Sequence, residues 1–145
     1  MRNWKLRKNV TSFVRAVVDT SFWIDAWRGD VNEAEKQTIA ELWRSGGGVL
    51  PQIVWLELLV GLRSPEERNY LFDLKAVSQW EPLTEDDGSI AEKQADVLRK
   101  KGVVLAATDL LVLTVAHRLG LPLIHHDEDF VRALKLPEFA WLRAR

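Results

Sequence analysis

Four carboxylates lie where apolar segments of the chain end or are interrupted. Asp19 follows an apolar run rich in β-branched residues, Glu57 lies inside a second apolar run, and Asp109 begins a third. Asp127 directly follows a short apolar segment, with Asp129 two residues further on. Carboxylates that converge repel each other, and a bound divalent cation removes that repulsion. Because the chain has no cysteine, the set favours an all-oxygen site for Mg²⁺ or Mn²⁺, with metal-assisted attack on a phosphodiester as its chemistry.

Each of these acids also has an ordinary structural explanation. Asp19 could cap the helix that follows it, and Asp109, Asp127 and Asp129 could complement helix dipoles in first turns. Glu57 is harder to explain, because a carboxylate inside a buried helix costs several kcal/mol unless it is paired or binds a metal. A salt bridge to Arg63 is the main alternative for that residue. The sequence alone leaves these readings open.

The elements that must position these acids follow from apolar periodicity and from turn residues. We expect strands at residues 13–19, 49–50, 76–81, 121–124 and 139–142, and helices at residues 22–28, 30–44, 51–63, 64–75, 84–101, 109–119 and 127–134. Alternating strands and helices predict a parallel sheet with helices on both faces, in a single domain over residues 1–145. Asp19 and Asp127 then share one sheet edge if their strands are neighbours. Asp30 and Thr108 are expected to cap the helices that they precede. The glycines of residues 45–48 are expected to end the helix at residues 30–44, because glycine permits left-handed backbone.

Composition narrows the protein class. The chain has 145 residues, a net charge of −1 and no cysteine, which excludes disulfides, thiolate metal sites and cysteine catalysis. The apolar run at residues 103–116 contains Asp109 and is too short to cross a bilayer, so a soluble, cytoplasmic protein without membrane contact is expected. Residues 1–12 are polar and basic, and we expect a loose arm there that either contacts phosphates or is simply solvated.

Other chemistries fit the sequence less well. His125 and His126 are adjacent, so on a strand they point to opposite faces and do not form a zinc site. Ser21 and Thr20 have no partner motif for nucleophilic catalysis. A phosphatase that uses Asp19 as its nucleophile needs an acid at position 21, where the chain has Ser21.

Four segments, in order and at suitable spacing, resemble the PIN-domain ribonucleases, and the VapC-type toxins of toxin–antitoxin pairs in particular. They are residues 17–24 (VVDTSFWI), Leu50-Pro51 with residues 57–61 (ELLVG), Thr108-Asp109, and residues 123–130 (LIHHDEDF). The resemblance covers about residues 13–142. It implies a three-layer α/β/α fold around a central parallel sheet of four to five strands.

The resemblance also implies a function for the acids. Asp19, Glu57, Asp109 and Asp127 would be the catalytic carboxylates that hold Mg²⁺ or Mn²⁺ for cleavage of RNA. Thr20, Ser21, His125 and Asp129 would support them from outside the metal's ligand set. Family members form homodimers and are inhibited by a cognate VapB-like antitoxin. An alternative is a non-catalytic PIN-like domain that only binds RNA or a protein.

Two features depart from the family pattern. His125 stands where the family often has Thr or Ser, two residues before the fourth acid. The arm of residues 1–12 is longer than the usual start, which lies close to the first strand. The first departure concerns the surroundings of Asp127. The second indicates either a mis-assigned start codon or a basic arm that contacts RNA.

Overall fold

A parallel sheet forms the centre of the protein in a computed structural model that describes residues 14–144. Its strands are β1 (Ala16–Val18), β2 (Gly48–Pro51), β3 (Gln79–Glu81) and β4 (Leu123–Ile124), in the spatial order β3-β2-β1-β4. All three pairings are parallel, as the sequence predicts. The predicted basic arm at residues 1–12 lies outside the described residues.

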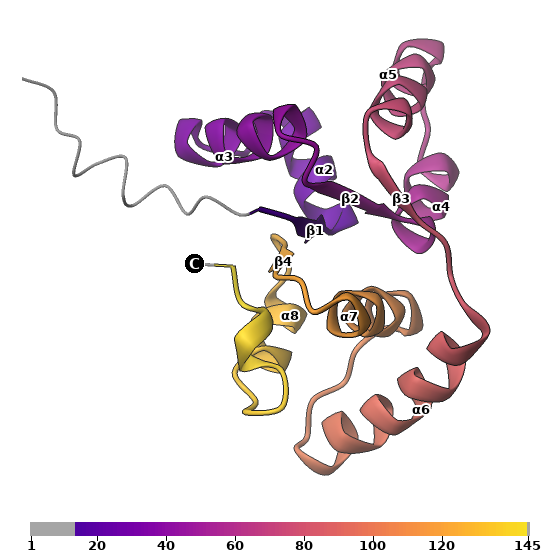
Figure 1. Ribbon diagram of the computed structural model, residues 1–145, viewed down its shortest axis with the longest axis vertical. Helices are drawn as coiled ribbons and strands as arrows, with labels where there is room; N and C mark the ends of the chain where they lie inside the picture. The colour runs from indigo at the N-terminus through magenta and orange to yellow at the C-terminus, as the bar shows by residue number, and fades with distance from the viewer. Residues whose placement is uncertain (1–13, 145) are drawn as a thin grey trace, which may run out of the picture.

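Helices cover both faces of this sheet, which gives the expected three layers. In Figure 1, α2 and α3 lie above the strands and α6 and α7 lie below them. The described helices are α2 (Thr20–Arg28), α3 (Glu33–Arg44), α4 (Gln52–Val60), α5 (Pro65–Ala76), α6 (Glu85–Lys100), α7 (Ala107–Leu119) and α8 (Glu128–Ala133), with a short 3-10 helix η1 (Ala140–Leu142). No helix in residues 14–144 is long and apolar enough to span a membrane.

The first strand is the most enclosed part of the sheet. All three residues of β1 are fully buried, because β2 and β4 flank it and helices cover it on both faces. Val17 is in register with Val49 of β2 and with Leu123 of β4. A continuous apolar run is the normal sequence of such an interior parallel strand. Asp19 therefore leaves the sheet from its centre.

The glycines before β2 serve close packing more than unusual backbone geometry. Only Gly46 of residues 45–48 has a left-handed backbone, with a φ of 80°. A Cβ at Gly47 would lie 2.0 Å from the Val14 carbonyl oxygen, and one at Gly48 would lie 2.3 Å from the Trp43 ring. Glycine is thus required at positions 47 and 48 because neighbouring groups occupy the space of a side chain.

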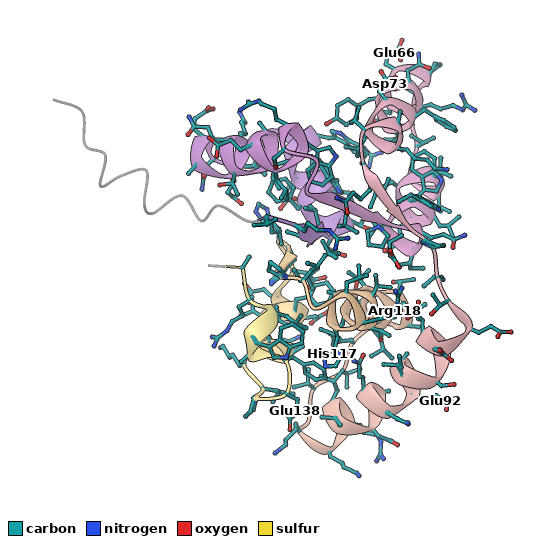
Figure 2. The ribbon with its side chains drawn as sticks, in the orientation of Figure 1. Glu66, Asp73, Glu92, His117, Arg118 and Glu138 are labelled. Carbon is teal, nitrogen blue, oxygen red and sulfur yellow. The ribbon has the colours of Figure 1, made fainter. Side chains whose placement is uncertain are left out.

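An ion pair joins the end of β3 to α6 and α7. Arg118, labelled in Figure 2, donates to Asp87 at 2.7 and 3.2 Å and to Glu81 at 2.7 Å. Asp87 is only 1% exposed. Burial raises the pKa of Asp87, but the Arg118 guanidinium and the Thr84 backbone outweigh that effect and hold it below its usual range. These contacts fix the helices that lie below the sheet.

Two predicted helix caps are wrong. Asn32, not Asp30, caps α3, because its side chain accepts from Glu35 N at 2.8 Å while Glu35 accepts from Asn32 N at 3.2 Å. This reciprocal capping box satisfies two backbone donors. Thr108 is not a cap either: it lies in the first turn of α7, which begins one residue earlier.

Two further expectations also need correction. The predicted strand at residues 139–142 is the helix η1, followed by a single bridge between Leu123 and Arg143. A β4 of two residues offers too short an edge for a full ladder. The helix expected at residues 51–63 ends at Val60 and is not buried all round, since Leu56 is 44% exposed and Val60 is 88% exposed.

Candidate metal centre

The ends of β1 and β4 bring Asp19 and Asp127 to the same sheet edge. The two strands are neighbours, and the Asp19 backbone N–H donates to the Ile124 carbonyl at 2.9 Å. A second link follows at once, because the His126 backbone N–H donates to Ser21 Oγ at 3.0 Å. The edge that the sequence predicts for these two acids is the one that the structure has.

Asp19 caps a helix with one carboxylate oxygen and leaves the other unpaired. Its Oδ2 accepts from Ser21 N at 3.0 Å and from Ser21 Oγ at 2.6 Å, at the start of α2. Its Oδ1 is buried and has no hydrogen-bond partner among the described residues. The residue itself is 2% exposed. A buried acceptor without a partner is costly, and a cation is one group that could satisfy it.

Glu57 is held by a hydroxyl and not by a cation. Thr20 Oγ1 donates to Glu57 Oε1 at 3.0 Å, which ties α4 to the start of α2. Within residues 14–144, no Lys or Arg forms an ion pair with Glu57, so the alternative of a salt bridge to Arg63 is not borne out. Glu57 is half-buried, less than the sequence predicts.

Asp109, Asp127 and Asp129 form the tightest group of acids. One carboxylate oxygen from each lies within 4.8 Å of the others. Asp109 is in the first turn of α7, while Asp127 caps α8 by accepting from Asp129 N at 2.8 Å. Asp129 also pairs with Arg132. The resemblance implies a place for Asp129 outside the ligand set, but its carboxylate lies within the acidic group, two residues along the chain from Asp127.

The pKa values show that these acids share one negative field. The pKa of Asp109 rises to about 6, first because of burial and then because of Asp19, Asp127, Glu57 and Asp129. Burial also raises the pKa of Asp19 against the effect of its hydrogen bonds to Ser21. The pKa of Glu57 is raised by burial and by Asp19, although the Thr20 hydroxyl lowers it. Asp19 and Glu57 thus lie within electrostatic reach of the tight group.

The donor set fits a hard divalent cation. Carboxylate oxygens are the ligands that Mg²⁺ and Mn²⁺ prefer, and the Asp19 Oδ1 atom supplies a buried acceptor that has no partner in the part of the chain that the structure describes. Within the described chain, Arg132 is the one cation that pairs with any of these acids, and it pairs with Asp129 at the outside of the group. Asp19, Glu57, Asp109 and Asp127 have no such partner there.

The two histidines have separate roles. His125 Nδ1 accepts from the Asp127 backbone N–H at 3.1 Å, and burial lowers the pKa of its imidazole. The His126 ring points elsewhere: its Nδ1 lies 2.8 Å from Asp25, and its Nε2 contacts Glu35. His126 thus connects the loop after β4 to α2 and α3, a link that no sequence pattern indicates.

Comparisons with known proteins agree with this fold. The chain is similar to the VapBC2 complex of Rickettsia felis bound to a promoter DNA fragment, with a TM-score of 0.68 at 16% identity over 85% of this chain and 93% of that one. It is also similar to VapBC-1 from nontypeable Haemophilus influenzae, with a TM-score of 0.67 at 21% identity over 83% and 93%. A toxin–antitoxin complex from Klebsiella pneumoniae gives a TM-score of 0.65 at 20% identity over 85% and 93%. These identities establish similarity of fold alone.

Comparison of the sequence itself gives a match to a family but not to a curated protein. No curated protein matches the chain. The sequence profile of the family described as "PIN domain" matches residues 16–136, a span that begins with β1 and ends just after α8. This protein therefore belongs to the PIN domain family, as the resemblance predicts.

Proposed function

We propose that this protein is a Mg²⁺- or Mn²⁺-dependent endoribonuclease and the toxin of a VapBC-type toxin–antitoxin pair. The observation that carries the proposal is the Asp19 Oδ1 atom, a buried oxygen without a hydrogen-bond partner in residues 14–144. It shares its electrostatic field with the tight group of Asp109, Asp127 and Asp129. Such an arrangement destabilises the metal-free protein, and it is useful where a cation is bound.

The proposed ligands are Asp19, Asp109 and Asp127, with Glu57 as a fourth catalytic carboxylate. The cation, when bound, would supply an activated water and neutralise charge on the phosphodiester. Ser21 orients Asp19 by donating to Oδ2, which leaves Oδ1 free for the cation. Thr20 orients Glu57 in the same way.

His125 and Asp129 support the fourth acid. His125 holds the backbone of Asp127, and Asp129 N donates to Asp127 Oδ1. Groups that orient metal ligands typically affect activity 10- to 100-fold. His125 stands where the family often has a hydroxyl residue, and its Nδ1 accepts from Asp127 N.

The non-catalytic alternative finds no support in these observations. A scaffold that only binds RNA or protein gains nothing from a carboxylate whose pKa is raised to about 6 by burial and by neighbouring acids. It gains nothing from a buried unpaired oxygen either. Both features cost stability unless a ligand compensates them.

The toxin role rests on the family and on the kind of complex in which similar folds are found. The similar structures above come from complexes described as VapBC or toxin–antitoxin. We therefore propose a cognate VapB-like antitoxin as the partner, a homodimer as the assembly, RNA as the substrate and the cytoplasm as the location. Expression of the protein alone should arrest growth, and co-expression of the product of the neighbouring reading frame should relieve that arrest.

Cleavage of RNA by the purified protein tests the enzymatic part. We expect cleavage with Mn²⁺ or Mg²⁺ that stops when EDTA is added. Asp127→Asn should reduce the rate at least about 100-fold, and Ser21→Ala about 10- to 100-fold, because Ser21 only orients a ligand. Asp96→Asn, which changes an exposed acid paired with Arg99, should leave the rate unchanged. Cleavage that persists in EDTA, or that Asp127→Asn does not slow, would remove the proposed mechanism.

A further inference from the structure

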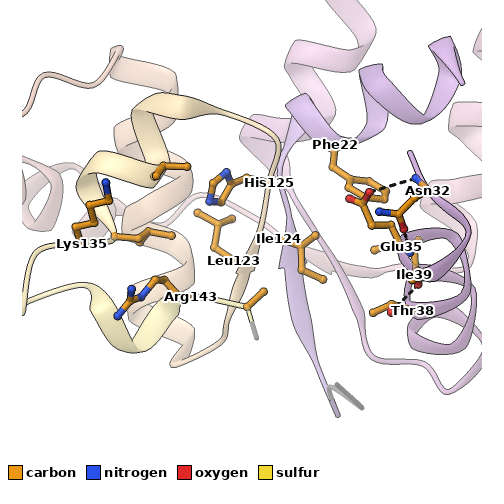
Figure 3. A pocket seen from close by; sticks show the side chains of 14 residues that line it. Phe22, Asn32, Glu35, Thr38, Ile39, Leu123, Ile124, His125, Lys135 and Arg143 are labelled. Carbon is orange, nitrogen blue, oxygen red and sulfur yellow. Dashed lines mark hydrogen bonds between the residues drawn. The ribbon is translucent and has the colours of Figure 1, made fainter. Parts of the chain in front are cut away.

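A cavity of about 460 Å³ lies beside the edge strand β4, between α3 and α8. Figure 3 shows its two walls: Thr38 and Ile39 of α3 on one side, and Lys135 and Arg143 on the other. Leu123 and Ile124 lie between the walls. A cavity of this size suits a small organic ligand.

The cavity adjoins the candidate metal centre through one side chain. His125 lines the cavity, and its Nδ1 accepts from the backbone of Asp127. Phe22, three residues after Asp19, lines the cavity from α2. A ligand in the cavity would therefore lie next to the acids that the proposed function uses.

The inside of the cavity suits a flat, largely apolar group. Phe22, Ile39 and Ile124 contribute apolar surface, and the His125 imidazole adds a second ring. On the α3 wall the polar side chains are Asn32, Glu35 and Thr38. Asn32 Oδ1 is used as the cap of α3, so the amide N–H groups of Asn32 are what it can offer a ligand. Aromatic base edges combine an apolar face with a few hydrogen-bonding positions in this way.

Two cations on the other wall suit an anionic group. Lys135 and Arg143 are exposed, and neither forms an ion pair within residues 14–144. Arg143 Nε donates only to the Ala140 carbonyl, at 3.2 Å. By contrast, Arg118 and Arg132 are both paired with carboxylates. Free cations beside a strongly acidic centre would attract a phosphate that the acids alone repel.

We propose that this cavity binds a nucleotide, with its base among Phe22, Ile39 and His125 and its phosphate at Lys135 and Arg143. The inference rests on the proposed function for its main source, a nucleotide of the RNA strand next to the bond that is cut. That nucleotide would help to determine which RNA sequence is cleaved. A free mononucleotide has the same chemistry and is the other source.

Equilibrium binding in EDTA tests the cavity without requiring catalysis. The four ribonucleoside 5′-monophosphates and a short single-stranded RNA would be titrated into wild type, Lys135→Ala/Arg143→Ala and Ile39→Phe. The first variant removes both cations, and the second fills the cavity. Lys100→Ala/Lys101→Ala is the matched control, since it removes two exposed cations at the end of α6. Thermal unfolding shows whether each variant is folded.

We expect saturable binding of at least one mononucleotide to wild type, weakened at least about tenfold by loss of both cations. Ile39→Phe should also weaken it, while the control should not. For the RNA, the slope of log affinity against log salt should fall by about 0.7 in the double cation variant, because the two cations together neutralise one phosphate. An unchanged RNA slope with weakened mononucleotide binding would assign the cavity to a free nucleotide and overturn the RNA source.

Other results would contradict the proposal that the cavity binds a nucleotide. These are the absence of saturable mononucleotide binding, or an equal loss of affinity in the control. If Ile39→Phe does not fold, the double cation variant, which changes only exposed residues, still decides the outcome. If the protein binds nucleotides but does not cleave RNA, the proposed nuclease activity is refuted and nucleotide binding at the cavity stands. The two proposals can therefore fail separately.

Discussion

The two carboxylate oxygens of Asp19 have different surroundings. Oδ2 accepts two hydrogen bonds from Ser21 and caps α2, while Oδ1 is buried without a partner among the described residues. The two roles that the sequence leaves open for Asp19, helix cap and cation ligand, are thus compatible in one side chain. Leaving a buried acceptor unpaired costs about 1–3 kcal/mol, which is a large fraction of a domain's stability.

Asp109 should make the metal-free protein less stable as pH rises. Its pKa in the folded protein is about 6, against 3.8 for an ordinary aspartate, so the folded state binds more protons than the unfolded state between these values. The resulting stabilisation is present below about pH 4 and is lost as pH rises through about 6.

Asp109→Asn should therefore raise the free energy of unfolding at neutral pH in EDTA. We expect about 1–2 kcal/mol, after allowance for solvent screening of a partly exposed group. Urea unfolding between about pH 4 and pH 8 measures this effect. Parallel pH profiles for wild type and variant would show that neither burial nor the other acids raise the pKa of Asp109 in the folded protein.

Among the helices and strands, the sequence predicts the type of each element better than the residues at which it begins and ends. Apolar periodicity identifies each helix and the four strands, because these patterns follow directly from the burial of one face or of both. Apolar periodicity fails where a tertiary contact determines the local structure. Asn32 replaces Asp30 as a cap through its reciprocal bonds with Glu35, and residues 140–142 form the helix η1, after which Arg143 makes a single bridge to Leu123 of β4.

The packing of Gly48 against Trp43 gives one test of element positions. Gly48→Ala would place a Cβ 2.3 Å from the indole ring at the start of β2, and this overpacking should cost about 1–3 kcal/mol. Gly88→Ala is the control, because no atom of the described residues lies within 4 Å of the added Cβ in helix α6. That change should stabilise the protein by about 0.5–1 kcal/mol. Equal effects in thermal unfolding would contradict this packing.

The ion pair of Arg118 gives a second test. Arg118→Ala leaves Asp87 buried without its partner, which should cost about 2–3 kcal/mol, less than for a fully buried pair because Arg118 is partly exposed. Arg99→Ala removes an exposed pair with Asp96 and should cost less than about 0.5 kcal/mol. Denaturant unfolding compares the two, and a loss of similar size in both would mean that Arg118 does not hold α6 and α7 together.

At the scale of the whole molecule, a net charge of −1 conceals an uneven distribution. The acids gather at the edge where β1 and β4 end, while Lys135 and Arg143, which form no ion pair within residues 14–144, lie at the neighbouring cavity. The sequence could predict the acids because each stands at the end of an element or inside an apolar run. It relates Asp129 to Asp127, but it could not predict that Asp129 joins the group with Asp109, or that Lys135 and Arg143 line one cavity, since no periodic pattern relates these residues. Only the folded chain brings these residues together.

The shift in melting temperature that Mn²⁺ produces tests most directly whether Asp19 and the acidic group bind a divalent cation. With Mn²⁺ at about 100 times its dissociation constant, wild type should gain about 2.7 kcal/mol by mass action, or about 5–10 °C. Asp96→Asn, outside the acidic group, should show the same shift. Asp19→Asn should show a much smaller shift, because Asn keeps the cap but lacks the charge of the unpaired oxygen. An equal shift in wild type and in Asp19→Asn would place the metal elsewhere and contradict the account.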